Sequence, residues 1–344
     1  MTLHRIALGG LVVLVLGVAV AGVATMRLVA RWEAPYRGFP TAEVFVQIMP
    51  GSGALAIGGQ LVESGVVQDE WAFRYALWKT NLGRGLKAGE YRFDQPLSVS
   101  QVVSKIERGD VHLRPLMFPE GLTVPAMASI FGRSDFGTAE EFLAASQRVE
   151  LIAALDPEAS DLEGYLFPDT YLLPRTITAD QLVERMVVRF RQAFGEPLLQ
   201  QPGEAGLSMR EVVTLASLIE RETALAEERP VVSAVYLNRL KIGIALRCDP
   251  TVIYALERAG LYEGNLTREN LTYDSPYNTY LYSGLPPGPI AAPGLASLEA
   301  AVKPADVGYL YFVSRNDGSH VFASSLREHN RNVREYQIQF FRER

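Results

Sequence analysis

Two glutamates, Glu220 and Glu222, stand where an apolar run ends, in the stretch LASLIERETA at residues 215–224. A carboxyl group held half-buried at the edge of a cleft has its charged form disfavoured, so its pKa rises. A carboxyl with a raised pKa can donate a proton near neutral pH and is a usable general acid. The stretch also contains Arg221, so it is equally compatible with a solvated helix end held by local ion pairs.

The element that must position both acids is a helix that begins after Ser208. Ser208 and Glu211 form the S-x-x-E pattern of a capping box. At about 100° per residue, Glu220 and Glu222 fall on opposite shoulders of the apolar face, so either one can reach a cleft edge. That face recurs at helical spacing and consists of Val212, Leu215, Ala216 and Ile219.

Further polar groups follow along the chain. Residues 227–243 predict a helix that begins near Pro230 and ends at Gly243. Asp249 stands before Pro250, which predicts a helix N-cap followed by proline at the first helical position. That structural role explains Asp249, and a second interpretation places it in the site as well.

The segment YDSPYNTYLYSGLPPGPIAAPG, residues 273–294, has too much Pro and Gly for regular structure. Long ordered loops are usually functional. Its amide, hydroxyl and aromatic groups suit carbohydrate binding and come from Tyr277, Asn278, Thr279 and Tyr280.

A second aromatic and acidic segment lies at residues 161–174, DLEGYLFPDTYLLP. It suits a sugar-binding surface and, equally, a packed loop that tethers the helices predicted at 138–146 and 179–194. Near the C-terminus, residues 309–325 predict a β-hairpin with Asn316, Asp317 and Gly318 in its turn. His320 and His329 are further candidate site residues, although a lone histidine is more often structural.

Composition excludes several classes of function. The 344 residues have a net charge of −6, which argues against nucleic acid as a partner. The single cysteine, Cys248, rules out an internal disulfide and a cysteine-based zinc site. No phosphate-binding glycine loop, H-x-x-x-H metal spacing or G-x-S-x-G elbow occurs, so we expect neither a metal nor a cofactor.

The N-terminal part indicates a membrane anchor. Residues 6–26 contain no charged side chain and are long enough to span a bilayer as a helix. A cleavable signal peptide ending near AVA at 19–21 is the alternative, but its apolar region is normally shorter. We therefore expect a cytoplasmic N-terminus at 1–5, a retained anchor at 6–26, a linker at 27–40 and an exported C-terminal part.

Residues 41–112 predict a small α+β domain with strands at 44–48 and 86–93 and helices near 54–65, 68–81 and 98–109. Its strand-turn-helix pattern at 48–61 returns weakly at 117–131 and is similar to LysM-type glycan-binding modules. The remainder, 113–344, predicts a mixed α+β catalytic domain in which a small sheet includes the hairpin and helices surround residues 209–222. The expected fold class is therefore α+β.

Four long motifs carry a resemblance to a known family: LASLIERET, NRLKIGIALRCDPTVIYAL, SPYNTYLYSGLPPGPIAAPG and YLYFVSRNDGSHVFASS. Together they resemble the YceG-like family of endolytic murein transglycosylases. The resemblance covers the whole chain. It implies an enzyme of the bacterial inner membrane, with a periplasmic catalytic domain, that cleaves nascent peptidoglycan strands and leaves 1,6-anhydro-muramyl ends.

The resemblance also implies roles for single residues. The catalytic glutamate of the family falls on Glu222, with Glu220 as the second candidate. Asp249, Tyr277, Asn278 and Thr279 are implied to line the same cleft. The implied partners are glycan strands and the membrane, with peptidoglycan synthases or division proteins as further candidates.

Two alternatives stay open on the residues alone. A hydrolase would use Glu222 as acid and Asp249 or Glu220 as second carboxylate, because hydrolysis typically needs two. A non-catalytic glycan-binding scaffold of the division machinery would not need the glutamates, but would need residues 41–112.

Overall fold

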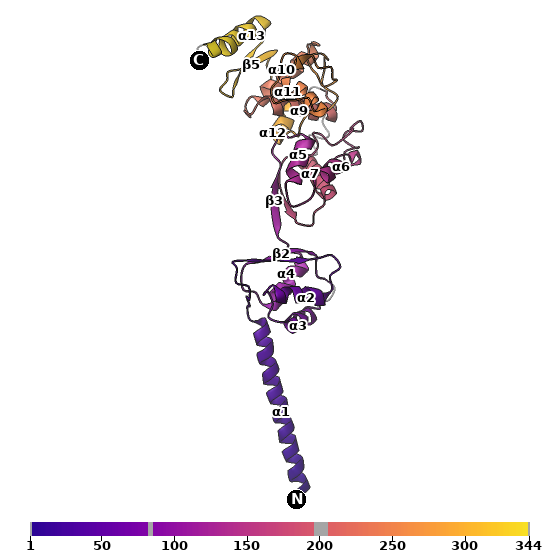
Figure 1. Cartoon of the computed structure of the whole chain (residues 1–344), viewed down its shortest axis with the longest axis vertical. Coiled ribbons are helices and arrows are strands. Elements are labelled where there is room, and N and C mark those ends of the chain that lie inside the picture. Colours follow the sequence, from indigo (N-terminus) through magenta and orange to yellow (C-terminus); the bar gives the residue numbers. More distant parts are fainter. Residues whose placement is uncertain (1, 82–84, 196–205, 343–344) are drawn as a thin grey trace. The chain divides into compact units, whose positions relative to one another are not determined.

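The computed structural model describes residues 2–81, 85–195 and 206–342 (Figure 1). The chain divides into two compact units. Unit 1 comprises residues 1–114 and 172–176, and unit 2 comprises residues 115–171 and 177–344. The boundary falls within β3 (Leu113–Met117) and β4 (Thr170–Pro174), which pair in a two-stranded sheet. The α+β class is confirmed, and an apolar N-terminal helix precedes it.

The N-terminal helix, α1, runs from Thr2 to Glu33. Its segment Leu14–Glu33 has a mean hydropathy of 1.7, and no residue of its most apolar stretch is buried, so it is long and apolar enough to span a membrane. Met1 lies outside the described residues. The helix continues beyond Met26, the last residue of the predicted anchor, because no proline or glycine follows before Pro35. The first part of the predicted linker is therefore helical.

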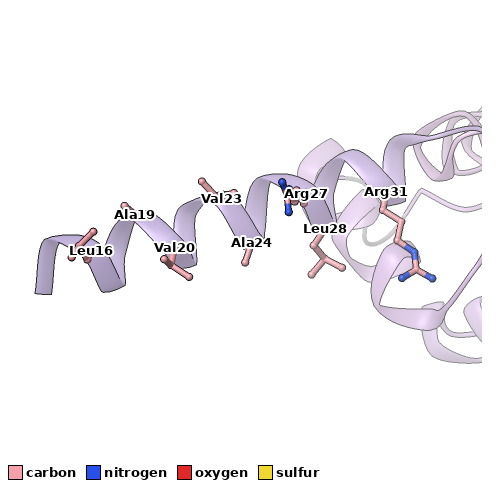
Figure 2. A pocket seen from close by; sticks show the side chains of 8 residues that line it. All are labelled: Leu16, Ala19, Val20, Val23, Ala24, Arg27, Leu28 and Arg31. Atoms are coloured by element: carbon pink, nitrogen blue, oxygen red, sulfur yellow. The ribbon is translucent and has the colours of Figure 1, made fainter. Parts of the chain in front are cut away.

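Figure 2 shows side chains along the outer surface of α1. The eight labelled side chains, from Leu16 to Arg31, all belong to this one helix. They are apolar except for Arg27 and Arg31, which lie toward the end of the helix. Such a surface suits contact with lipid chains.

Within residues 2–81 and 85–112, unit 1 contains one two-stranded sheet and three helices after α1. In the sheet, β1 (Val44–Ile48) runs antiparallel to β2 (Gly89–Phe93), with Val46 opposite Tyr91. The helices are α2 (Ala54–Glu63), α3 (Glu70–Thr80) and α4 (Val99–Arg108). Local residues fix both ends of α4. Ser98 forms a capping box with Gln101 at the start, and Gly109 ends the helix at φ 72°. The strands and helices predicted here are confirmed, whereas the likeness to LysM modules stays a prediction.

Unit 2 is mostly helical. Its elements after β3 are α5 (Val124–Gly132), α6 (Ala139–Ala145), η1 (Val149–Leu151), β4, α7 (Ala179–Phe194), α9 (Met209–Glu222), α10 (Arg229–Lys241), α11 (Asp249–Ala259), η2 (Asn270–Thr272), α12 (Leu295–Val302), β5 (Tyr311–Ser314), β6 (His320–Ala323), α13 (Leu326–Val333), the π-helix η3 (Arg334–Gln339) and α14 (Phe340–Arg342). The strands β5 and β6 form the predicted hairpin. Within the described residues they pair only with each other, so the expected larger sheet is wrong.

The helix α9 lies at the centre of unit 2. It contacts α10, α11 and α12, and every residue from Val212 to Ile219 is buried. The capping box of Ser208 and Glu211 begins the helix as predicted. Because the buried core surrounds α9 on several sides, the helix is a rigid support for the two glutamates at its end.

Candidate active site

A pocket of about 660 Å³ lies beside the last residue of α9. Its walls come from the end of α9, the loop before α11, the hairpin β5–β6 and α13. The polar side chains that face it include Glu222, Asp249, Tyr280 and His320. Segments far apart in the sequence therefore bring a carboxyl pair, a phenol and an imidazole to one pocket.

Glu222 is half-buried, and its side chain lines this pocket. Burial raises its pKa, and the negative charge of Asp249 adds to the rise. The Cys248 thiol donates to Glu222 Oε2 at 3.5 Å, and with the neighbouring Tyr236 hydroxyl it offsets part of the rise. Within the described chain, that hydroxyl is buried without a hydrogen bond of standard geometry. A larger share of Glu222 is therefore protonated near neutral pH than of an ordinary glutamate.

Glu220 is held in a different environment. Its Oε2 accepts hydrogen bonds from the Gly294 backbone N–H at 3.0 Å and from Ser297 Oγ at 2.8 Å. Its Oε1 pairs with Arg229 Nη2 at 3.2 Å, and both side chains are largely buried. Glu220 thus fastens α9 to the start of α12, and it does not line the pocket beside Glu222.

Asp249 faces the pocket but does not cap its helix. The N-cap of α11 is Cys248, and Asp249 and Pro250 occupy the first two helical positions, so the predicted N-cap is wrong by one residue. Proline fits there because the first backbone N–H groups of a helix lack intrahelical partners. The exposed Asp249 accepts a short hydrogen bond from the Tyr280 hydroxyl. Asp249 is therefore free of a capping role and is oriented by Tyr280.

The loop that contains Tyr280 is fixed by two buried polar residues. Asn278 Nδ2 donates to the carbonyl oxygens of Leu271 at 3.1 Å and Tyr273 at 2.8 Å, and Asn278 Oδ1 accepts from the Tyr280 N–H at 2.9 Å. Thr279 Oγ1 accepts from the Cys248 N–H at 3.0 Å. Both side chains are almost inaccessible to solvent, at 0% and 1% exposure. They position Tyr280 and Cys248, and their predicted contact with substrate stays a prediction.

Tyr277 lies away from the pocket of Glu222. Its ring packs against Tyr254 with centroids 5.0 Å apart, and the Arg258 guanidinium lies 5.7 Å from its ring centroid. It lines a separate small cavity instead. The structure therefore does not bring Tyr277 together with Glu222, whereas Tyr280, three residues later in the same loop, reaches the pocket.

The two candidate histidines both line the pocket. His320 Nδ1 lies 2.7 Å from Glu228 Oε2, and the His320 N–H donates to Glu228 Oε1 at 2.8 Å. His329 stacks on Tyr311 with ring centroids 5.1 Å apart, and burial lowers its pKa. The sequence did not predict that Tyr236 and the Cys248 thiol act on the Glu222 carboxyl, because neither residue belongs to a motif that indicates such a contact.

The aromatic segment 161–174 is a packed loop followed by β4. Tyr165 and Phe167 are buried, and the Tyr165 hydroxyl donates to Asp156 Oδ2 at 2.8 Å. Glu163 is buried too, and both of its oxygens lie 3.1 Å from the Val124 backbone N–H at the start of α5. Of the two interpretations that the sequence left open, the structure supports packing for these residues.

In the described part of the chain, no three His, Cys, Asp or Glu side chains gather as a metal site would require. What the pocket does provide is one half-buried carboxyl with a raised pKa and a second, exposed carboxyl group in the same lining. This arrangement can donate a proton to a bound substrate and then accept one back.

Comparison with known proteins points to one family over most of the chain. The sequence model of the YceG-like family matches residues 46–335. The chain belongs to the YceG-like family. Relatives named endolytic murein transglycosylase include one from Bacillus subtilis, 30% identical over 308 residues, which is 85% of this chain and 84% of that protein. Another, from Streptococcus pneumoniae D39, is 32% identical over 325 residues, and the chain spans 58% of its length.

A solved structure of the YceG-like family is similar as well. The crystal structure of a yceG-like protein from Listeria monocytogenes aligns with a TM-score of 0.57 at 30% sequence identity. The alignment covers 84% of this chain and 98% of the Listeria chain. All six residues predicted for the site lie within the range that matches the YceG-like family; these are Glu220, Glu222, Asp249, Tyr277, Asn278 and Thr279.

Proposed function

We propose that this chain is an endolytic murein transglycosylase, a lyase that cuts MurNAc–GlcNAc β-1,4 bonds inside nascent peptidoglycan strands. The observation that carries the proposal is the half-buried carboxyl of Glu222, which lines a pocket in unit 2 and whose pKa is raised by burial. The relatives named endolytic murein transglycosylase support the substrate. The pocket supports the chemistry, because one acid that can also act as a base suffices for intramolecular cleavage.

In the proposed reaction, protonated Glu222 donates its proton to the glycosidic oxygen, and the bond from that oxygen to C1 of MurNAc breaks. The resulting carboxylate accepts the proton of the C6 hydroxyl, whose oxygen closes onto C1 to give a 1,6-anhydro end. The 2-acetamido group of MurNAc stabilises the positive charge at C1. Acid–base assistance of this kind contributes about 100-fold to 10,000-fold. No water is consumed, and Glu222 ends in its starting protonation state.

The other predicted residues take supporting roles in the proposal. Asp249 and Tyr280 face the pocket and bind sugar hydroxyl groups. Asn278 and Thr279 act through the loop that they hold, and Tyr277 supports that loop from its far side. Glu220 keeps the end of α9 in place through Gly294 and Ser297.

A hydrolase is the second candidate, because Asp249 lines the same pocket as Glu222. In that reaction one carboxyl protonates the leaving oxygen while the second activates water or forms a covalent intermediate. The two reactions differ in the new sugar end. Hydrolysis adds water there, whereas the lyase reaction closes the sugar onto its own C6 oxygen.

Anchoring completes the proposal. The apolar helix α1 spans the inner membrane once, and both units lie in the periplasm, where nascent glycan strands are found. Strand cleavage next to the membrane would limit strand length as the wall grows. Peptidoglycan synthases and division proteins are the partners that such a role implies.

The test is product analysis with the full-length chain in detergent and purified peptidoglycan. Wild type, Glu222→Gln and Glu220→Gln are compared by mass spectrometry of the released fragments, and circular dichroism reports whether each variant is folded. We expect internal fragments with 1,6-anhydro ends from wild type and a loss of at least about 100-fold in Glu222→Gln. Folded Glu220→Gln should retain cleavage.

Three results would overturn parts of the proposal. Loss of cleavage in folded Glu220→Gln, with activity kept in Glu222→Gln, would assign the acid to Glu220. Fragments that carry an added water at the new reducing end would assign a hydrolase. No cleavage by wild type under any condition would favour the non-catalytic scaffold.

A further inference from the structure

We propose that α3 of unit 1 lies on the membrane surface and binds the lipid headgroup layer through its exposed aromatic face. One side of the helix packs into the core of unit 1 through Ala72, Phe73, Ala76 and Leu77. The other side consists of Trp71, Arg74, Tyr75 and Trp78, spaced at i, i+3, i+4 and i+7. This inference rests on the proposed anchoring by α1.

The aromatic face of α3 is unusually exposed for its composition. Trp71 is 65% exposed and Trp78 is 78% exposed. The Arg74 guanidinium lies 4.7 Å from the Trp71 ring centroid, so a cation accompanies the indole. Tryptophan, tyrosine and arginine together suit the membrane interface, where an apolar ring meets a polar and anionic layer.

All three tryptophans of the chain gather at this place. Trp32, near the end of α1, donates from its Nε1 to Asp69 Oδ2 at 3.2 Å, and its ring lies 5.5 Å from that of Tyr75. Lys79 Nζ pairs with Glu33 at 2.7 Å. The end of α1 is therefore fastened to both ends of α3, and α3 cannot move away from it freely.

These contacts also set the direction of α3. Along the segment of α3 they extend from Asp69 to Lys79, which is about 15 Å at the rise of an α-helix, whereas along α1, with the Arg31–Gln68 hydrogen bond included, they span only Arg31 to Glu33. α3 thus runs across the end of α1 rather than along it. If α1 spans the bilayer, α3 lies closer to the membrane plane than to the membrane normal.

The depth agrees with this placement. The uncharged segment of α1 ends at Met26, and Trp32 follows about 9 Å further along the helix axis. The headgroup region on each side of a bilayer is roughly 5–8 Å thick. Trp32 therefore lies just beyond the outer edge of that layer, so the exposed rings of α3 meet the headgroup layer, where tryptophan is enriched in membrane proteins, from its aqueous side.

The experiment uses the full-length chain in vesicles of phosphatidylcholine and phosphatidylglycerol, with lipids that carry bromine near the headgroup or near the bilayer centre. Bromine quenches tryptophan emission at short range. The difference in emission between wild type and the Trp71→Phe, Trp78→Phe double variant isolates the two tryptophans of α3 and leaves Trp32 and its bond to Asp69 in place. We expect bromine near the headgroup to quench the emission of Trp71 and Trp78. Acrylamide in the aqueous phase should quench this emission only weakly, because the lipid shields the two rings.

A second variant separates the inference from the proposed anchoring. Leu16→Trp, added to the double variant, places a reporter within the apolar segment of α1. If this reporter is quenched by bromine at the bilayer centre while Trp71 and Trp78 stay open to acrylamide, the anchor holds and the inference on α3 is wrong. If the reporter is not quenched, the anchoring is wrong and the inference fails with it.

A glycan-binding role for the same face would give a different result. Purified glycan strands, added to the chain in detergent without vesicles, would then shield Trp71 and Trp78 from acrylamide. We expect no shielding, and a clear shielding would overturn the assignment to lipid.

Discussion

The buried carboxyl of Glu163 makes the folded chain sensitive to pH in a way that the substitution Glu163→Gln should remove. Burial raises the pKa of Glu163 from an ordinary value of 4.5 to about 8, and the charge of Asp161 adds to the rise. The Val124 N–H, the Tyr254 hydroxyl and Arg258 offset part of it. The unfolded chain therefore loses this proton at lower pH than the folded chain does.

The sign and size follow from proton linkage. Between pH 4.5 and about 8 the folded state binds more protons at Glu163 than the unfolded state, so stability falls as pH rises through this window. Each pKa unit is worth about 1.4 kcal/mol, so the full contribution is about 5 kcal/mol. Between about pH 5.5 and about pH 8 it amounts to about 3 kcal/mol, or a change of roughly 6–12 °C in melting temperature.

The assay compares thermal unfolding of wild type and Glu163→Gln at those two pH values by calorimetry. When the pH is raised, we expect the melting temperature of the variant to increase by roughly 6–12 °C relative to that of wild type. The reason is that glutamine keeps an acceptor for the Val124 N–H and never ionises. Any pH-independent effect of glutamine cancels in this difference. The exposed Glu227→Gln controls for the loss of one negative charge. A difference between wild type and Glu163→Gln that does not change with pH would refute the reasoning.

Two further predictions concern the pocket of unit 2. Cys248→Ala removes a donor that lowers the pKa of Glu222, so the alkaline limb of the pH profile of glycan cleavage should move to higher pH; an unchanged limb would mean that the thiol does not act on the carboxyl. Burial alone would raise the pKa of Glu228, but hydrogen bonds from His320 and Thr223 lower it, so its contribution to stability is present near neutral pH and is lost as pH falls. Glu228→Gln should therefore lower the melting temperature more at about pH 7 than at about pH 3, and equal losses would contradict this sign.

Elements with local signals could be predicted from the sequence closely. The helix α4 begins after Ser98 and ends before Gly109, as expected, because the side chains that start and stop it lie within the helix ends themselves. The same holds for the hairpin, whose turn contains Asn316 at φ 64° and Gly318 at φ 92°. Such signals act over a few residues, so no knowledge of the tertiary fold is needed.

The ends of two other elements also have local causes. The anchor helix continues to Glu33 because the charged residues after Met26 are good helix formers and only Pro35 stops the helix. At α11, proline was expected at the first helical position, but it occupies the second. At either position a backbone N–H would lack an intrahelical partner, so proline is tolerated at both. The sequence pattern D-P alone does not distinguish these two registers.

The roles of the acids could not be predicted from spacing, because their partners are distant in the sequence. Glu220 is bound by Gly294 and Ser297, more than seventy residues further on. Glu163 is buried against Tyr254, which belongs to α11. Composition marked both 161–174 and 273–294 as suited to sugar, and only packing decided that Tyr165 and Phe167 of the first are buried while the second places Tyr280 in the pocket.

The two glutamates at the end of α9 occupy opposite electrostatic environments. Glu220 reaches the N-terminal end of α12, where the partial positive charge of the helix and the Gly294 N–H stabilise a carboxylate. Glu222 is the last residue of α9 itself, where unpaired backbone carbonyl groups carry partial negative charge. These carbonyl groups disfavour a negative charge on the Glu222 side chain. Burial in the pocket acts in the same direction on Glu222. A separation of two residues turns the side chains about 200° apart, so one helix end supplies both a structural tie to α12 and a carboxyl whose pKa is raised.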